Sequence, residues 1–180
     1  MHDDDPKSSP VRLRTAVAAD IPTILDLIRE LADFERDPDS AVATPELMHD
    51  ALFSPGHVAD AIMAEDDSDA LGFALYFFNF STWTGRRGLY LEDFYVRPRS
   101  RGRGVGRQLF ARLATIARER GCARMDLSVL NWNVDAIRFY ERNDGVPMNE
   151  WTHFRFESEA IARIAASDPG TVGDTGMTHS

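Results

Sequence analysis

The sequence predicts an α/β fold in which helices cover both faces of one sheet. Segments with strand-like and helix-like patterns alternate along the 180 residues. Residues 89–96 are apolar at both odd and even positions, which is typical of a strand buried on both faces. A glycine-rich stretch follows and leads directly into a segment with helical apolar spacing. A hydrophobic content of 43% over this length is enough for one domain with a sizeable core.

Composition and charge narrow the classes of partner. The formal net charge of -9 argues against a nucleic-acid or anionic-membrane partner and is compatible with a cationic substrate. Cys122 is the single cysteine, which leaves no disulfide within the chain and suits a reducing compartment. No run is long and apolar enough to span a membrane, and acids stand at the start, where a signal peptide needs cations. We therefore expect a cytoplasmic protein. The histidines lack ligand spacing, so we expect no metal.

The first part of the chain reads as an arm, a strand and a helix. Residues 1–10 are polar and contain prolines, which is typical of a disordered arm, and residues 11–16 form the first expected strand. Asp20 is placed to cap a helix that runs to about Phe34. Glu35 stands at the end of this helix, where a solvated acid is the simplest interpretation. The apolar face of the helix consists of Ile21, Ile24, Leu25, Ile28, Leu31 and Ala32.

A second helix and two strands follow. Thr44 is placed to cap a short helix that begins with a proline. We expect strands at about 57–64 and at 71–80, and the second is long and aromatic, as a central strand should be. Residues 81–88 form a connection that contains Trp83. A tryptophan in a loop is more often a packing anchor, but beside an acidic cavity it could line a channel for an aliphatic cation.

The strand at 89–96 contains two adjacent carboxylates, Glu92 and Asp93. Ionised groups are costly to bury unless they are paired or hydrated, so we expect both to open onto a cavity. Pro98 ends the strand because it cannot donate to a ladder. By strict alternation, one face carries Tyr90, Phe94 and Val96, and the other Leu89, Leu91 and Tyr95.

The loop after this strand combines glycines with arginines at the start of a helix. Such a loop lets a polyanion approach the backbone, where the unpaired N–H groups and the positive end of the helix dipole bind phosphate oxygens. The alternative is a tight turn with solvated arginines. The spacing fits neither the P-loop nor the dinucleotide fingerprint. The residues are Gly102, Gly104 and Gly106, with Arg97, Arg99, Arg101, Arg103 and Arg107, and the helix that follows places Val105, Leu109, Phe110, Leu113, Ile116 and Ala117 on its apolar face.

The last part of the chain supplies one more strand, one helix and a terminal region. Residues 125–130 alternate like a strand, and 131–144 form a helix that contains Tyr140. Spacing alone favours a core-packing role for this tyrosine. Residues 147–157 read as one or two terminal strands, and residues 166–180 as a disordered tail.

The motif R-x-x-G-x-G, at Arg101, Gly104 and Gly106, resembles the acyl-coenzyme A pyrophosphate loop of the GNAT acetyltransferase superfamily. The strand LYLEDFYV before it is similar to the diamine (spermidine/spermine) N-acetyltransferase branch. With TAVAADIPTILDLIRELADFE and NWNVDAIRFY, four separate blocks match in order, over residues 11–157. The resemblance implies a GNAT domain at 11–165, with a mixed, mostly antiparallel sheet and helices on both faces.

The resemblance also implies how acetyl-CoA is bound. The backbone of the strand at Phe94, Tyr95 and Val96 should hold the pantetheine arm, and Asn133 and Ala136 should make further contacts with coenzyme A. The pyrophosphate should lie on Arg101, Gly102, Arg103, Gly104, Val105, Gly106 and Arg107.

Catalytic and substrate residues follow from the same resemblance. Tyr140 matches the tyrosine that protonates the departing thiolate. Glu92 matches the acid that lines the amine pocket and relays the amine proton through water. The positions of other substrate-pocket residues are occupied by Phe34, Glu35, Trp83 and Asp93.

Two departures from the family pattern affect these expectations. Most relatives have a glycine that closes the helix containing the catalytic tyrosine, whereas here Asp144 stands at that place and Gly145 follows. Aspartate tolerates the left-handed cap conformation better than most residues. Trp151 and Thr152 replace acidic or small residues of the mammalian polyamine enzymes, which weakens the case for spermidine itself.

The sequence thus predicts an N-acetyltransferase that uses acetyl-CoA to acetylate a primary amine of a small cationic substrate, either a polyamine or a lysine- or thialysine-like amino acid. Two alternatives are a non-catalytic acyl-CoA-binding sensor and an enzyme that acts on a protein amino group. Retention of both Glu92 and Tyr140 favours an enzyme, because a binding module needs only the glycine loop. Since relatives form dimers, we expect a homodimer whose interface includes Trp151 and Phe154.

Overall fold

The computed structural model describes residues 9–168 in two units, which divide after Asn133. Most of the arm expected at 1–10 and most of the tail expected at 166–180 therefore lie outside the described residues. None of the helices within 9–168 is long and apolar enough to cross a membrane.

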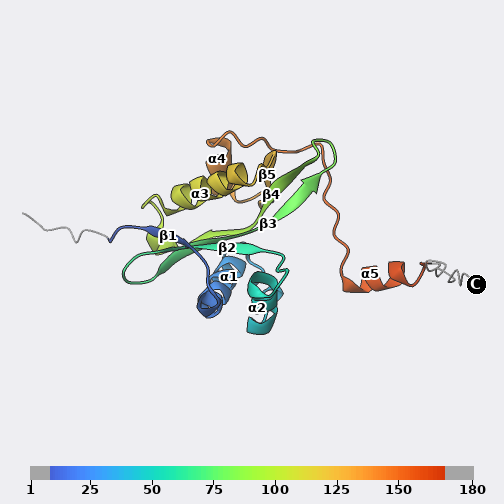
Figure 1. Cartoon of the computed structure of the whole chain (residues 1–180), viewed down its shortest axis with the longest axis horizontal. Coiled ribbons are helices and arrows are strands. Elements are labelled where there is room, and N and C mark those ends of the chain that lie inside the picture. Colours follow the sequence, from blue (N-terminus) through green and yellow to red (C-terminus); the bar gives the residue numbers. More distant parts are fainter. Residues whose placement is uncertain (1–8, 169–180) are drawn as a thin grey trace, which may run out of the picture. The chain divides into compact units, whose positions relative to one another are not determined.

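The first unit contains a five-stranded sheet in the order β1-β2-β3-β4-β5. Neighbouring strands are antiparallel from β1 to β4, and β5 pairs with β4 in parallel. Helices α1 and α2 cover one face and α3 covers the other (Figure 1). The predicted mixed, mostly antiparallel sheet between helices is therefore confirmed. The bounds are β1 Arg12–Thr15, α1 Ile21–Glu35, α2 Pro45–Phe53, β2 Asp60–Glu65, β3 Ala70–Ser81, β4 Arg86–Val96, α3 Val105–Glu119 and β5 Arg124–Leu127.

A separate apolar core fills each side of the sheet. Ile24 and Leu27 of α1 are fully buried against Phe73 of β3 on one side. On the other side, Leu109 and Leu113 of α3 pack on the strand residues that point away from α1. Burying side chains of this size stabilises the fold by about 1.5–3 kcal/mol each before the loss of chain entropy is counted. The two cores hold the ends of α1, β4 and α3 in fixed positions.

A β-bulge interrupts β4 at Glu92. Leu75 of β3 is opposite Asp93, and the next residue of β3, Tyr76, is opposite Leu91, so Glu92 is the extra residue. Strict alternation would place Leu91 and Tyr95 on one face. The bulge instead leaves Leu91 in the α3 core and Tyr95 in the α1 core. The predicted face pattern is therefore wrong beyond Leu91.

Several predicted boundaries shift because local turns intervene. β2 begins at Asp60 instead of His57, since the His57 N–H donates to the Ser54 carbonyl in a turn. β5 ends at Leu127, short of the predicted residue 130. Asp20 is the residue that precedes α1, as predicted, but its carboxylate does not cap that helix. It accepts from the Val17 N–H at 2.8 Å and from the Arg14 guanidinium instead.

The second unit contains two helices, α4 at Val134–Glu141 and α5 at Ser158–Ala165. α4 is shorter than predicted, because a turn precedes it, with the Asn133 N–H donating to Leu130. Asp144 has a φ of 63° and so adopts the left-handed conformation expected of it. The Gly145 N–H then donates to the Tyr140 carbonyl at 2.9 Å.

The prediction of terminal strands is wrong for the described residues. Residues 147–157 form no strand, and α5, which was not predicted, follows them. The apolar alternation at 147–157 suits a strand, but a strand also needs a neighbour with which to exchange backbone hydrogen bonds. The spacing of Ile161 and Ile164 was the helical signal for α5.

Candidate functional site

The glycine loop places backbone N–H groups at the start of α3. Gly102 and Gly104 have φ values of 77° and 78°, a conformation that favours glycine. Gly104 immediately precedes α3, and no side chain caps this helix within the described residues. A Cβ atom at Gly106 would make only ordinary contacts with Val96 and Phe94, at 3.8 and 3.9 Å. Packing therefore does not require glycine at 106, whereas close approach of a ligand to the backbone would.

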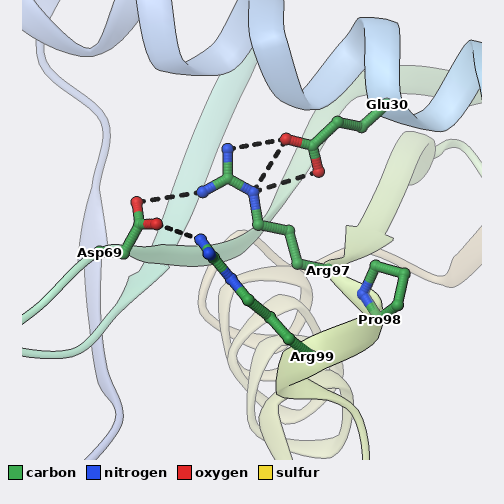
Figure 2. A pocket seen from close by; sticks show the side chains of 5 residues that line it. All are labelled: Glu30, Asp69, Arg97, Pro98 and Arg99. Carbon is green, nitrogen blue, oxygen red and sulfur yellow. Dashed lines mark hydrogen bonds and ion pairs between the residues drawn. The ribbon is translucent and has the colours of Figure 1, made fainter.

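The arginines of this region divide into two groups. Arg97 pairs with Glu30 of α1 at 2.8 Å and with Asp69 at 3.0 Å, and Arg99 also pairs with Asp69 (Figure 2). These residues line an open hollow whose charges already neutralise one another. Arg103 is held in the same way by Asp66 at 3.0 Å. Through these ion pairs, the three arginines hold the loop against α1 and against the segment that contains Asp66 and Asp69.

The remaining two, Arg101 and Arg107, have no carboxylate within ion-pair distance among residues 9–168. Both are exposed. The Arg101 Nε donates to the Val96 carbonyl at 3.1 Å. These two guanidiniums are therefore the cations that the loop can offer to an anion.

β4 extends past the end of β5. The parallel pairing runs from Gly88 to Leu91, opposite residues 124–127. β4 then continues through Phe94, Tyr95 and Val96, and the strand pairings within residues 9–168 join this part of β4 to β3. An extended chain could lie along this edge as an additional strand. The edge leads directly into the glycine loop.

Three carboxylates lie near the bulge. Glu92 is exposed, and Asp93 beside it is partly buried. Burial, followed by the charges of Glu92 and of Glu35, raises the pKa of Asp93 to about 6. Glu35 is the last residue of α1, and partial desolvation of its carboxyl, with Asp37 nearby, raises its pKa as well. The structure thus brings Glu35 close enough to Asp93 of β4 for its charge to act on that carboxyl.

An aromatic and cationic stack lies beside Glu35. The Phe34 and Trp132 rings pack with their centroids 5.6 Å apart. The Arg101 guanidinium lies 5.1 Å from the Phe34 ring, and the Arg36 guanidinium 4.9 Å from the Trp132 ring. Sequence reasoning missed both Arg36 and Trp132. The only available signal for Trp132 was its place in the NWN block that contains Asn133.

The structure does not bring Trp83 to this cluster. Trp83 lies in the turn between β3 and β4 and is 89% exposed. That turn closes with Ser81 opposite Arg86, whereas Asp93 is opposite Leu75. At about 3.3 Å per residue, the turn is about 20 Å along the strands from Asp93.

Of the residues expected to make further contacts with coenzyme A or to protonate its thiolate, Asn133 ends the first unit, and Ala136 and Tyr140 lie on α4 of the second unit. Tyr140 is partly buried, and its ring meets the Phe139 ring edge-on with centroids 5.4 Å apart.

Residues 24–145 match the Acetyltransferase (GNAT) family. The chain belongs to this family. It is 36% identical to thialysine N-epsilon-acetyltransferase of Sus scrofa over 166 residues, which cover 86% of this chain and 97% of that protein. It is 34% identical to spermidine/spermine N(1)-acetyltransferase-like protein 1 of Homo sapiens, over 86% of this chain and 24% of that one. The structure of an integron cassette protein from V. cholerae matches with a TM-score of 0.73 and 27% identity, over 87% of this chain and 98% of that one.

These comparisons confirm the predicted family, fold and enzyme class. The chain is an acetyl-transferring enzyme, and the family in general takes the acetyl group from acetyl-CoA. The non-catalytic sensor considered above is therefore not supported.

Because the pKa of Asp93 is raised in the folded state, the free energy of unfolding of this acetyltransferase depends measurably on pH. The folded pKa, about 6, lies above the unfolded value of 3.8, so the folded state binds more protons between the two. The contribution of Asp93 to stability is therefore fully present below the unfolded pKa and is lost as pH rises through about 6. Relative to the wild type, Asp93→Asn should gain about 2–3 kcal/mol in free energy of unfolding between pH 4 and pH 7. Urea unfolding of both proteins at the two pH values measures this, and a pH-independent difference would contradict it.

Proposed function

We propose that this acetyltransferase transfers the acetyl group of acetyl-CoA to a primary amine of a small cationic substrate, either a polyamine or a lysine- or thialysine-like amino acid. The observation that supports this most directly is the group of three carboxylates, Glu35, Glu92 and Asp93, near the bulge in β4. Burial is the main cause of the raised pKa of Asp93, and the charges of Glu92 and Glu35 add to it; a cationic amine next to the three acids would offset that added repulsion. The relatives named for thialysine and for spermidine or spermine have the same class of substrate.

The proposed binding mode for acetyl-CoA follows the edge of β4. The backbone of Phe94, Tyr95 and Val96 pairs with the pantetheine arm as a strand would. The pyrophosphate lies on the N–H groups from residue 102 to the first turn of α3, and its charge is met by Arg101 and Arg107. In this arrangement Arg103 contributes through its backbone, because its guanidinium is paired with Asp66. Asn133 and Ala136 make the further contacts with coenzyme A that the family resemblance implies.

The reaction needs a neutral amine. An alkyl ammonium has a pKa of about 10.4, so roughly one molecule in a few thousand is neutral at pH 7. In the proposed mechanism, Glu92 accepts the proton through water, and Asp93 and Glu35 bind the positive charges of the substrate. The amine nitrogen attacks the thioester carbonyl carbon, a C–N bond forms and the C–S bond breaks. Tyr140 donates its hydroxyl proton to the departing thiolate and recovers one from the amine through solvent.

We also propose that the enzyme acts in the cytoplasm as a homodimer. The partly buried thiol of Cys122, the single cysteine, suits a reducing compartment. Trp151 and Phe154 are 65% and 80% exposed, and they belong to the segment 147–157, whose alternation suits a strand. A second copy of the chain would cover these side chains and supply the neighbouring backbone.

The cofactor site can be tested with matched glycine substitutions. Gly104→Glu places a carboxylate at the proposed pyrophosphate position and should weaken acetyl-CoA binding by about tenfold or more. Gly56→Glu is the control, because Gly56 has a similar φ of 81° and open space around it. Both variants carry the same backbone strain and the same added charge. Calorimetric titration measures the affinities, and equal affinities in the two folded variants would contradict the proposed site.

The catalytic roles can be tested with two conservative substitutions. Tyr140→Phe should lower kcat by about 10²–10³ at every pH and leave acetyl-CoA affinity nearly unchanged, since a general acid acts in the transition state. Glu92→Gln should lower turnover mainly near pH 7 and recover as pH approaches the pKa of the amine. Tyr76→Phe, in the α3 core, is the control for removal of a buried hydroxyl. Normal turnover with a lowered melting temperature in Tyr140→Phe would mean that Tyr140 is a core residue.

The proposed dimer has a simple hydrodynamic test. The wild type should sediment as a dimer at micromolar concentration, and Phe154→Asp should shift it toward monomer, because a carboxylate would be buried at the interface. Val42→Asp is the control, since Val42 is 77% exposed in the first unit. A monomeric wild type would overturn this assignment.

A further inference from the structure

Arg36 occupies a backbone position that favours glycine. It follows the last residue of α1 and has a φ of 65°. Its N–H closes the helix by donating to the Ala32 and Asp33 carbonyls. Helices commonly end in this conformation, but usually with glycine or asparagine, because a side chain is strained there. Strained backbone conformations cluster at functional sites, so the contacts of the Arg36 side chain are of interest.

The side chain of Arg36 belongs to the aromatic and cationic stack at the end of α1. Its guanidinium lies 4.9 Å from the Trp132 ring centroid, and Trp132 packs on Phe34, which precedes Glu35. Trp132 is 43% exposed, so the stack has an accessible side. The ring contact fixes the direction of a long side chain that would otherwise be mobile.

The guanidinium of Arg36 has no counter-ion within the described part of the chain. Residues 9–168 place no carboxylate within ion-pair distance of it, although Arg14 and Arg97 are each paired with two carboxylates. Arg101, the other cation of the stack, is assigned above to the pyrophosphate. The Arg36 guanidinium is fixed by its contact with the Trp132 ring and has no ion pair within residues 9–168. It is thus available to an anionic group of the substrate.

We propose that Arg36 binds the carboxylate of an amino-acid substrate and so makes the enzyme select a lysine-like α-amino acid over a polyamine. This inference rests on the proposed function. Glu35 and Arg36 present a carboxylate and a guanidinium from consecutive residues, which match the ammonium and the carboxylate of an α-amino acid. Asp93 and Glu92 then remain for the amine at the far end of the substrate, which is acetylated. A polyamine would bring a second cation toward Arg36, and like charges disfavour that complex.

Two substrates that differ only in the carboxylate provide the test. Thialysine and its decarboxylated analogue, a diamine with the same chain, are assayed for coenzyme A release. The wild type should prefer thialysine in kcat/KM by about tenfold or more, as expected for one charge-assisted pair. Arg36→Gln should lose that preference, with kcat/KM falling for thialysine and not for the diamine.

The controls separate this role from a structural one. Arg29→Gln, at an exposed position of the same helix where Arg29 pairs with Asp26 at 2.9 Å, should keep the preference. If Arg36 only packs on Trp132, Arg36→Gln will lower kcat/KM for both substrates by the same factor, and the inference is wrong. Thialysine methyl ester, which keeps the ammonium and lacks the anion, tests the wild type without any variant. Equal kcat/KM for thialysine and its ester would overturn the role of Arg36 and leave the proposed function intact, whereas failure to acetylate any of these amines would overturn the proposed function.

Discussion

The bulge at Glu92 is the constraint on which the site depends. One extra residue in β4 lets Leu91 and Phe94 face the same core, although alternation would place them on opposite faces. Because the apolar residues on both sides of the bulge are anchored in cores, the two acids between them are held in place. The bulge also comes directly after the last pairing with β5. The bulge therefore fixes the two carboxylates at the point where the pairing of β4 with β5 ends.

The ion pairs around Arg97 give the glycine loop a rigid frame. The Arg97 side chain is only 14% exposed, and it connects the end of β4 to Glu30 of α1 and to Asp69 in the β2–β3 turn (Figure 2). Arg103 makes a comparable connection to Asp66 in the same turn. A loop with two left-handed glycines loses much entropy when it is ordered. Because the ion pairs of Arg97 and Arg103 already hold this loop, less entropy remains to be lost when an anion binds to it.

Sequence reasoning predicted the parts of this structure that depend on local patterns. The helical spacing of α3, the cap at Thr44 and the left-handed Asp144 follow from neighbouring residues and are confirmed. The bulge could not be predicted, because it is defined by the pairing between β3 and β4 and by neither strand alone. The contact between Arg36 and Trp132 joins distant parts of the chain and leaves no periodic signal. The terminal strands were predicted wrongly because alternation describes a strand but not its neighbour.

The stack beside Glu35 also contains an intrinsic fluorophore, the indole of Trp132. The enzyme's three tryptophans occupy different settings: Trp83 in a solvent-exposed turn, Trp132 in contact with Phe34 and Arg36, and Trp151 in the segment before α5. Indole emission depends on the polarity and charge around the ring. With Trp83 and Trp151 replaced by phenylalanine, the remaining fluorescence would come from Trp132 alone. Changes at the end of α1 could then be followed in solution without an attached label.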